Sequence, residues 1–351
     1  MEKILPKLDD AVILIYFDIL EKAFRPSKIP SSKTFRSFFN RITSALSLTA
    51  SAAVSTEIPT SDCTTAGKSF IPSPGENFRV IANGERKERL ENKGVTVNGI
   101  NYKFPIITPD VMGDEADLII IGVKGYSLEQ AIEDIRNQVG KNTLILSLLN
   151  GVDSEECLIK EFGNEHVLYS FMRMSVVMKD GKADFDPYWG KIHFGEKDNH
   201  QYTDRVLAVK EVFDKADIPY SIEKDMLKGI WFKYMCNIGE NMTCALLGIP
   251  FGAFRTDDNA NWIRINAMRE VAAIAGKKGI DLGEKEIEAQ NKTVVTIPEK
   301  NKPSTLQDLE AGKKTEIDMF AGNVVKMGKE LNVPTPINEM FYHGIRVLEN
   351  K

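Results

Sequence analysis

The stretch Asp117-Leu-Ile-Ile-Ile-Gly-Val123 decides the fold of this chain, because it is an uninterrupted apolar run that ends at the turn Lys124-Gly125. Such a run is typical of a central strand in a parallel sheet, which is buried on both faces. A second run, Thr143-Leu-Ile-Leu-Ser-Leu-Leu149, follows an amphipathic segment at 127–138 and ends at Asn150-Gly151. The alternation of buried strands with helices predicts an α/β domain built on a Rossmann-like parallel sheet.

The same alternation extends outward from these two runs and then stops. It begins with a strand at Phe78–Ala82 and ends with a helix near 203–216. Beyond residue 225 the pattern predicts helices alone, at about 225–247, 259–279, 284–296, 316–331 and 337–349. We therefore expect residues 78–222 to form most of the Rossmann-like domain and residues 223–351 to form an all-α C-terminal domain.

Residues 1–77 have a different composition. Residues 41–70 contain twelve Ser or Thr, and Gly67 is the one glycine before Gly75. A GxGxxG turn, whose backbone holds a dinucleotide pyrophosphate at a helix N-terminus, needs three glycines. The first strand and the glycine-rich turn of a Rossmann domain are therefore expected to be missing or replaced, which would leave the sheet open in its middle. An upstream shift of the reading frame, or a disordered segment, would explain the change in composition.

Composition excludes several classes of protein. The net charge of -5 argues against nucleic acid as a partner, and no long basic tract points to a membrane surface. The apolar segment 11–20 is interrupted by Asp18 and is too short to span a bilayer. The cysteines and histidines form no pattern of metal ligands, so we expect no metal and a cytoplasmic protein with reduced thiols. Its candidate partner is a small molecule.

Lys233, Asn237 and Asn241 form the most informative polar group. They are spaced four residues apart within the mostly apolar run 227–246. On a helix, this spacing places one ammonium and two carboxamides along one stripe. An ammonium can stabilise or protonate a developing alkoxide, and a carboxamide can hold a hydroxyl or a carbonyl. The alternative is that the stripe is merely a solvated face.

Two strand ends carry further candidates. Ligands of open α/β sheets bind beyond the carboxyl ends of the parallel strands, where Lys124-Gly125 and Asn150-Gly151 follow their strands. Each turn pairs a polar side chain with a glycine that lets a ligand approach the backbone, although both are equally compatible with ordinary loops. Later in the chain, Glu316 is an acid that we expect to meet Lys233, unless it lies on the surface of a lysine-rich helix.

The end of the Phe78 strand bears on the cofactor. An acidic residue there usually holds the ribose hydroxyls of NAD. This chain instead has Asn83-Gly84 followed by a basic group that includes Arg86. Basic side chains suit a 2′-phosphate, so NADP is expected rather than NAD. A solvated helix start with mixed charges explains the same residues.

From about Phe78 to Lys351 the chain resembles the ketopantoate reductase (2-dehydropantoate 2-reductase) family. Five motifs in their order and spacing carry the resemblance: Ile119-Ile-Ile-Gly-Val-Lys-Gly-Tyr126, Leu148-Leu-Asn-Gly-Val152, Trp231-Phe-Lys-Tyr-Met-Cys-Asn-Ile-Gly-Glu-Asn241, Ser304-Thr-Leu-Gln-Asp308 and Thr315-Glu-Ile-Asp318. The resemblance implies NADPH-dependent reduction of 2-dehydropantoate to (R)-pantoate, on the route to pantothenate and coenzyme A. It also implies a C-terminal domain that binds substrate, and we expect a homodimer.

The resemblance assigns roles to individual residues. Lys233 is implied as the general acid and Glu316 as its acidic partner near the substrate. Asn237 and Asn241 are implied to hold the substrate hydroxyl, and Ser304 to contact its carboxylate. Lys124 and Asn150 are implied to lie beside the nicotinamide and its ribose. Two alternatives stay open: a reductase of another 2-keto acid, and a catalytically impaired product that keeps the helical domain as a scaffold.

Overall fold

The computed structural model describes residues 13–17, 78–97, 100–173, 177–179, 182–184, 190–216 and 218–351. The chain divides into two compact units. The first comprises residues 1–123, 127–149 and 155–224, and the second comprises residues 124–126, 150–154 and 225–351. Two short turns, Lys124–Tyr126 and Asn150–Ser154, therefore belong to the second unit although they follow strands of the first.

The first unit is built on an eight-stranded sheet in the order β12-β11-β8-β7-β6-β1-β2-β5. Strand β11 pairs antiparallel with β8, and the other pairings of this sheet are parallel. The expected parallel-rich α/β fold is thus confirmed. The strands are β1 (Ile13–Phe17), β2 (Phe78–Ile81), β5 (Ile106–Ile107), β6 (Ala116–Gly122), β7 (Val139–Ser147), β8 (Val167–Arg173), β11 (Lys191–Gly195) and β12 (Tyr220–Ser221).

Strand β1 corrects one expectation about the N-terminal segment. It lies between β6 and β2, with Ile13 opposite both Leu118 and Phe78. The middle of the sheet is therefore filled, because the apolar run at 13–17 supplies the strand that the sequence did not reveal. The remaining residues of the segment 1–77, where a glycine-rich turn was expected to be missing, lie outside the described residues.

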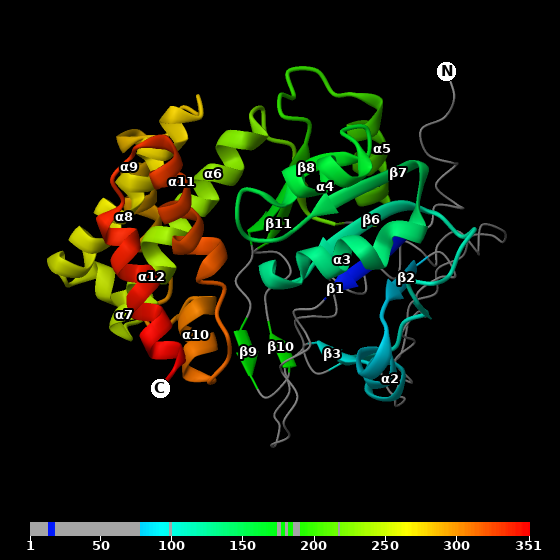
Figure 1. Cartoon of the computed structure of the whole chain (residues 1–351), viewed down its shortest axis with the longest axis horizontal. Helices are drawn as coiled ribbons and strands as arrows, with labels where there is room; N and C mark the ends of the chain where they lie inside the picture. The colour runs from blue at the N-terminus through cyan, green and yellow to red at the C-terminus, as the bar shows by residue number, and fades with distance from the viewer. Residues whose placement is uncertain are drawn as a thin grey trace, which may run out of the picture. The chain divides into compact units, whose positions relative to one another are not determined.

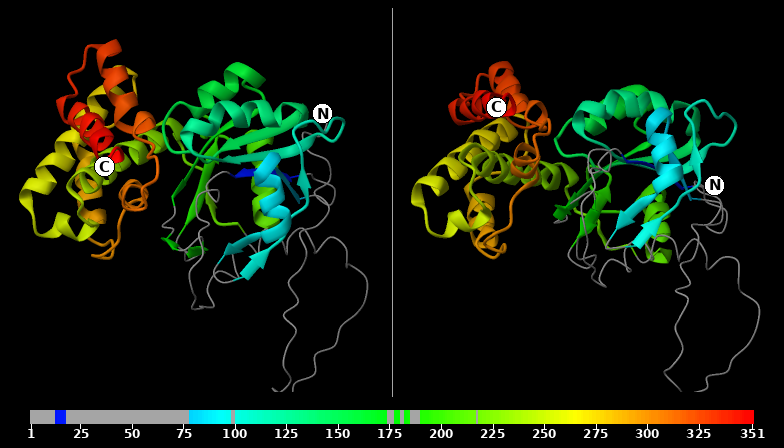
Figure 2. Two further views of the ribbon diagram at one scale, coloured as in Figure 1. Left: turned by 60° about the horizontal axis from the view of Figure 1, so that its bottom comes forward. Right: turned by 90° about the horizontal axis from the view of Figure 1, so that it is seen from below.

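Alternation along the central strands explains why helices cover both faces of this sheet. Leu118 and Ile120 of β6 belong to one core, whereas Ile119 and Ile121 belong to another. The first core includes Leu90 of helix α2 (Gly84–Lys93) and four residues of α5 (Asp204–Lys215); the second includes residues of α3 (Leu128–Ile135) and α4 (Ser154–Phe162). The layers can be followed in Figures 1 and 2.

A smaller four-stranded sheet has the order β4-β3-β10-β9. Its strands are β3 (Val95–Val97), β4 (Ile100–Tyr102), β9 (Val177–Lys179) and β10 (Lys182–Asp184). Strands β3 and β4 are antiparallel, and the two residues between them, Asn98 and Gly99, lie outside the described residues. Gly94 ends α2 with φ of 61°, and a Cβ there would collide with the carbonyl of Tyr102. This position therefore requires glycine.

The second unit is helical throughout its described elements, as the pattern beyond residue 225 predicts. Its helices are α6 (Met226–Cys236), η5 (Asn237–Met242), α7 (Thr243–Leu247), η6 (Phe251–Arg255), α8 (Asp258–Lys277), α9 (Glu284–Val294), α10 (Ser304–Glu310), η7 (Asp318–Gly322), α11 (Asn323–Leu331) and α12 (Pro336–Glu349). They enclose one apolar core that includes Tyr234, Ile238 and Phe320. None of the described helices is both long and apolar enough to cross a membrane.

Two segments of this unit, η5 and η7, are π-helices. In a π-helix each backbone N–H bonds one residue further back than in an α-helix, and such turns occur frequently at functional sites. The single helix expected at 225–247 is therefore α6 and α7 joined through a π segment. Likewise, the helix expected at 316–331 begins with η7 and continues as α11.

His193 of β11 is half-buried and contacts Phe171 and Glu223. Its ring stacks on Phe171 with centroids 4.3 Å apart, and its Nδ1 lies 2.7 Å from Oε1 of Glu223. Burial lowers the pKa of His193; Glu223 opposes this shift, while the charges of Arg173 and Lys191 reinforce it.

We expect the stability contributed by neutral His193 to be lost on acidification. The unfolded chain binds the proton near the ordinary histidine pKa of about 6.5, whereas the folded chain binds it only at lower pH. Stability should therefore fall as pH drops below about 6.5. Urea unfolding between about pH 7.5 and about pH 5.5 should show that the free energy of unfolding falls more steeply with pH for the wild type than for His193→Gln. His200→Gln, at an exposed histidine, is the control, and equal slopes for wild type and His193→Gln would contradict the expectation.

Candidate functional site

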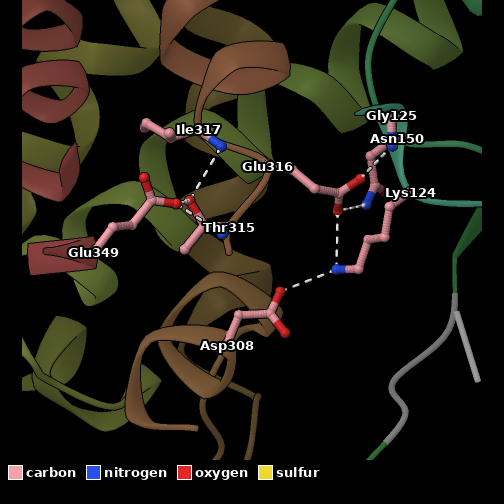
Figure 3. Close-up of polar contacts among 8 residues, drawn as sticks. All are labelled: Lys124, Gly125, Asn150, Asp308, Thr315, Glu316, Ile317 and Glu349. Carbon is pink, nitrogen blue, oxygen red and sulfur yellow. Dashed lines mark hydrogen bonds and ion pairs between the residues drawn. The ribbon is translucent and has the colours of Figure 1, made fainter. Parts of the chain in front are cut away.

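Lys124 stands at the centre of a charged cluster in the second unit. The residue follows β6 after Val123, in the turn Lys124–Tyr126. Its Nζ lies 3.0 Å from Oδ2 of Asp308 and 3.2 Å from Oε2 of Glu316 (Figure 3). These side chains are largely buried, with exposed fractions of 20% for Lys124, 17% for Asp308 and 4% for Glu316. The ammonium of Lys124 therefore bridges two carboxylates that both lie far from it in the sequence.

The carboxylate of Glu316 joins both strand-end turns. Its Oε1 accepts a hydrogen bond of 3.0 Å from the backbone N–H of Gly125, in the turn after β6. Its Oε2 also accepts from Nδ2 of Asn150, in the turn after β7, at 3.5 Å. Lys124, Asn150 and Glu316 are thus brought together, as Figure 3 shows. The structure pairs Glu316 with Lys124. The contact expected between Glu316 and Lys233 stays a prediction.

The two carboxylates keep Lys124 charged. Burial by itself would lower the pKa of Lys124, but the charges of Glu316 and Asp308, together with their hydrogen bonds, outweigh burial and raise it above its ordinary value. An ammonium of this kind supplies fixed positive charge. It is poorly suited to release its proton at neutral pH.

Asp308 belongs to the cluster although sequence reasoning gave it no role. It lies on α10, one turn after Ser304, so the two side chains share one face of the helix. Ser304 itself is exposed at the start of α10. Two features of the sequence indicate Asp308. It follows Ser304 by four residues, and a lysine such as Lys124 needs an opposite charge if it is buried.

Lys233, Asn237 and Asn241 lie on the continuous helical segment formed by α6, η5 and α7. Lys233 is on α6, and the two asparagines are on the π-helix η5. Lys233 and Asn237 are half-buried, whereas Asn241 is buried. The π-helix η5, which carries both asparagines, packs against α10 and η7. Helix α10 carries Ser304, and η7 begins two residues after Glu316.

Gly125 and Gly151 both lie against the side chain of Met319. A Cβ at Gly125 would lie 2.5 Å from Sδ of Met319, and a Cβ at Gly151 would lie 3.1 Å from Cγ of Met319. Real Cβ atoms do not approach other atoms to 2.5 Å without displacement. The absence of a side chain at both glycines leaves room for the side chain of Met319. Met319 therefore packs against both strand-end turns.

Asn83 and Arg86 lie in the first unit, at the end of β2. Asn83 is exposed and caps α2, its Oδ1 accepting the N–H of Gly84 at 2.7 Å. Arg86 is 9% exposed. A Cβ at Gly84, where φ is 50°, would meet nothing within 4 Å, so the turn is open beside the positive start of α2. The open turn exposes Asn83 and the positive start of α2 to an anion, whereas Arg86 is buried.

The described groups are chemically suited to binding a polar organic molecule. They comprise an ammonium held between carboxylates, a carboxamide and two further amides on a nearby helix. Among the described residues no group of His, Cys, Asp and Glu is placed to hold a metal ion. The chemistry such side chains offer is hydrogen bonding, charge stabilisation and proton transfer.

Comparison with known proteins identifies two matching family patterns. The pattern described as "Ketopantoate reductase PanE/ApbA" matches residues 71–199. The pattern described as "Ketopantoate reductase PanE/ApbA C terminal" matches residues 225–349. The two matches together cover most of the chain beyond its N-terminal segment.

Individual proteins are also similar to this chain. A 2-dehydropantoate 2-reductase of Pyrococcus horikoshii is 27% identical over 287 residues, which cover 80% of this chain and 92% of that protein. In fold, the chain is similar to D-mandelate dehydrogenase, solved with NADH and anilino(oxo)acetate, with a TM-score of 0.69 and 22% identity over 78% of this chain and 90% of the other. It is also similar to dimeric ketopantoate reductase of Staphylococcus aureus, with a TM-score of 0.62 and 17% identity over 78% of this chain and 91% of the other.

Proposed function

This chain belongs to the ketopantoate reductase family, and from that premise we propose that it reduces 2-dehydropantoate to (R)-pantoate with NADPH, on the route to pantothenate and coenzyme A. The observation that carries the proposal is the convergence of Lys124, Gly125 and Asn150 on the carboxylate of Glu316. Turns after parallel strands are where open α/β sheets bind ligands. Here two such turns meet an acid that the family resemblance implies in the site.

Lys233 is the proposed general acid. When hydride reaches the carbon of a ketone, negative charge develops on the oxygen, and a positioned ammonium stabilises this charge and then donates its proton. Asn237 and Asn241 lie one and two turns further along the same helical segment. We propose that they hold the substrate hydroxyl, while Ser304 contacts the substrate carboxylate.

Lys124, Glu316 and Asn150 have a proposed role in binding and orientation. The raised pKa of Lys124 keeps it positive, and Glu316 fixes it through a contact of 3.2 Å. Glu316 is proposed to act near the substrate as the acidic partner of the general acid. Lys124 and Asn150 would hold the nicotinamide end of the cofactor.

NADP is the proposed cofactor, and the described residues fit part of it. Asn83 and Arg86, beside the open turn at Gly84, would hold the adenine-ribose end with its 2′-phosphate. When bound, the reduced nicotinamide supplies the hydride. The protein binds and orients the reactants and delivers the proton.

A second candidate substrate class is another 2-keto acid. The support for this alternative is the similarity in fold to D-mandelate dehydrogenase, which was solved with NADH and anilino(oxo)acetate. The side chains that handle the keto group and the carboxylate are proposed to be the same in both cases. The substituent on the keto acid would distinguish them.

The experiment follows NADPH and NADH oxidation with 2-dehydropantoate and with a panel of aliphatic and aromatic 2-keto acids. We expect the highest kcat/KM with 2-dehydropantoate and NADPH, because basic residues follow β2. A preference for an aromatic 2-keto acid would favour the alternative, and a preference for NADH would overturn the choice of cofactor. Absence of turnover with every pair would overturn the proposed activity.

The homodimer stays a proposal. Its support is that the S. aureus protein of similar fold is described as dimeric. A small-molecule 2-keto acid is the proposed partner of each chain. The cytoplasmic location and the absence of nucleic-acid and membrane partners stay predictions from composition.

A further inference from the structure

Tyr234 makes an unusual contact with the segment that follows Glu316. It is 1% exposed, and its hydroxyl lies 2.7 Å from the carbonyl oxygen of Phe320 and 3.1 Å from that of Met319. Both carbonyls belong to the π-helix η7. Tyr234 itself lies on α6, next in sequence to Lys233. One side chain of the helix that carries the proposed general acid therefore holds two backbone groups of η7.

The turn that Tyr234 holds begins at Glu316. The N–H of Phe320 donates to the carbonyl of Glu316 at 3.0 Å, and the N–H of Gly322 donates to the carbonyl of Ile317 at 2.9 Å. On the other side of Glu316, the backbone N–H and the hydroxyl of Thr315 both donate to Oε1 of Glu349 at 2.7 Å (Figure 3). The backbone is thus held on both sides of Glu316. Glu349 holds Thr315, which precedes it, and Tyr234 holds η7, which follows it.

The position of Glu316 is strict because both of its oxygens are engaged. One accepts the N–H of Gly125, and the other meets Lys124 and Asn150. Met319, whose carbonyl accepts from Tyr234, packs its side chain against Gly125 and Gly151. A displacement of η7 would therefore disturb the carboxylate and the packing of both turns together.

We infer that Tyr234 is a positioning residue that holds the carboxylate of Glu316 in register with Lys124 and Gly125 through its hydroxyl bonds to η7. The expected effect of Tyr234 on catalysis rests on the proposed function. Its expected effect on the stability of η7 rests on the contacts alone. Burial, with a smaller contribution from Asp153, raises the pKa of Tyr234 well above its ordinary value. The hydroxyl consequently remains a donor at neutral and moderately alkaline pH.

Tyr234→Phe removes the hydroxyl and keeps the ring. We expect kcat to fall about tenfold, since a small misplacement of a catalytic group costs one to two orders of magnitude in rate. KM for NADPH should change little. The control is Tyr220→Phe, because Tyr220 lies in the first unit and also donates a bond of 2.7 Å, to Asp214. A kcat for Tyr234→Phe within twofold of that for Tyr220→Phe would overturn the inference.

A double-mutant cycle with Glu316→Gln separates positioning from general weakening of the fold. If Tyr234 acts through Glu316, adding Tyr234→Phe to Glu316→Gln should lower kcat by less than twofold further. A further tenfold loss in the double variant would mean that Tyr234 acts independently of Glu316, and would overturn the inference.

Hydrogen exchange provides a readout that does not depend on turnover. Amide exchange in the peptide covering 315–325 should be faster in Tyr234→Phe than in the wild type, and unchanged in Tyr220→Phe. If the wild type reduces no 2-keto acid, the proposed function fails, and this measurement alone decides the inference. Equal exchange in wild type and Tyr234→Phe would overturn it.

Discussion

Lys233→Ala is expected to lower kcat for 2-keto acid reduction by about 10² or more, the usual scale for loss of a general acid. The ammonium both stabilises the developing alkoxide and donates the proton, so the effect should fall on kcat rather than on the KM for NADPH. Alanine has a high helix propensity, so we expect α6 to remain intact after the substitution. Circular dichroism and the thermal midpoint should therefore stay close to those of the wild type.

Lys228 provides a matched control for Lys233 on the same helix. Its ammonium lies 3.1 Å from Asp281 and 2.9 Å from Glu286, at the surface of the second unit. Lys228→Ala removes an equal charge from α6 and should leave kcat within about twofold, as expected for an exposed ion pair. If Lys233→Ala behaves like Lys228→Ala in an active preparation, Lys233 is not the general acid.

Lys124 is a second lysine in the proposed site, but its expected role differs. Its two carboxylate partners raise its pKa, which opposes release of the proton to a substrate oxygen. This property supports fixed charge at Lys124. Proton donation by Lys233 stays a proposal that rests on the family resemblance.

The largest loss of stability is expected for Arg264→Met. Arg264 is 1% exposed, and its Nη1 lies 3.7 Å from Oε1 of Glu240, which is 5% exposed. Oε1 of Glu240 also accepts from Gln290 at 2.7 Å. Removing the guanidinium leaves Glu240 as a buried charge without its cation, which typically costs about 3–5 kcal/mol. Urea unfolding should show this decrease in the free energy of unfolding.

Arg269→Met is the matched control, since Arg269 lies on the same helix α8. Its side chain is 49% exposed and pairs with Glu284 at 2.7 Å. An exposed pair of this kind contributes at most about 1 kcal/mol. The double variant Glu240→Gln/Arg264→Met should recover part of the loss, because it also removes the buried negative charge. Equal stability of Arg264→Met and Arg269→Met would contradict the buried-pair argument.

Most strands and helices could be predicted because their signals are local. The run at 117–123 is apolar without interruption and corresponds to β6, and the helix expected near 203–216 corresponds to α5. The helices beyond residue 225 repeat apolar residues at helical spacing and bury them in one core. Such patterns do not depend on distant partners.

The features that escaped prediction depend on pairing over long distances. Strand β1 is identified by its parallel partners β2 and β6, and β2 begins more than sixty residues later in the sequence. Asp308 lies 184 residues from Lys124 along the chain. Tyr234 reads in the sequence as one more aromatic residue of the core, and only the fold shows that its hydroxyl reaches η7.

The π-helix η5 has a consequence for how the amine and the two amides can share a side of their helix. In an α-helix, four residues advance by about 400°, so each step of four drifts about 40° past a full turn. Over the eight residues from Lys233 to Asn241, that drift would amount to about 80°. The wider turn at Asn237–Met242 advances less per residue and counteracts the rotation. Seven residues of ordinary winding advance by about 700°, so loss of the extra residue from this stretch would still leave Asn241 within about 20° of Lys233 around the axis.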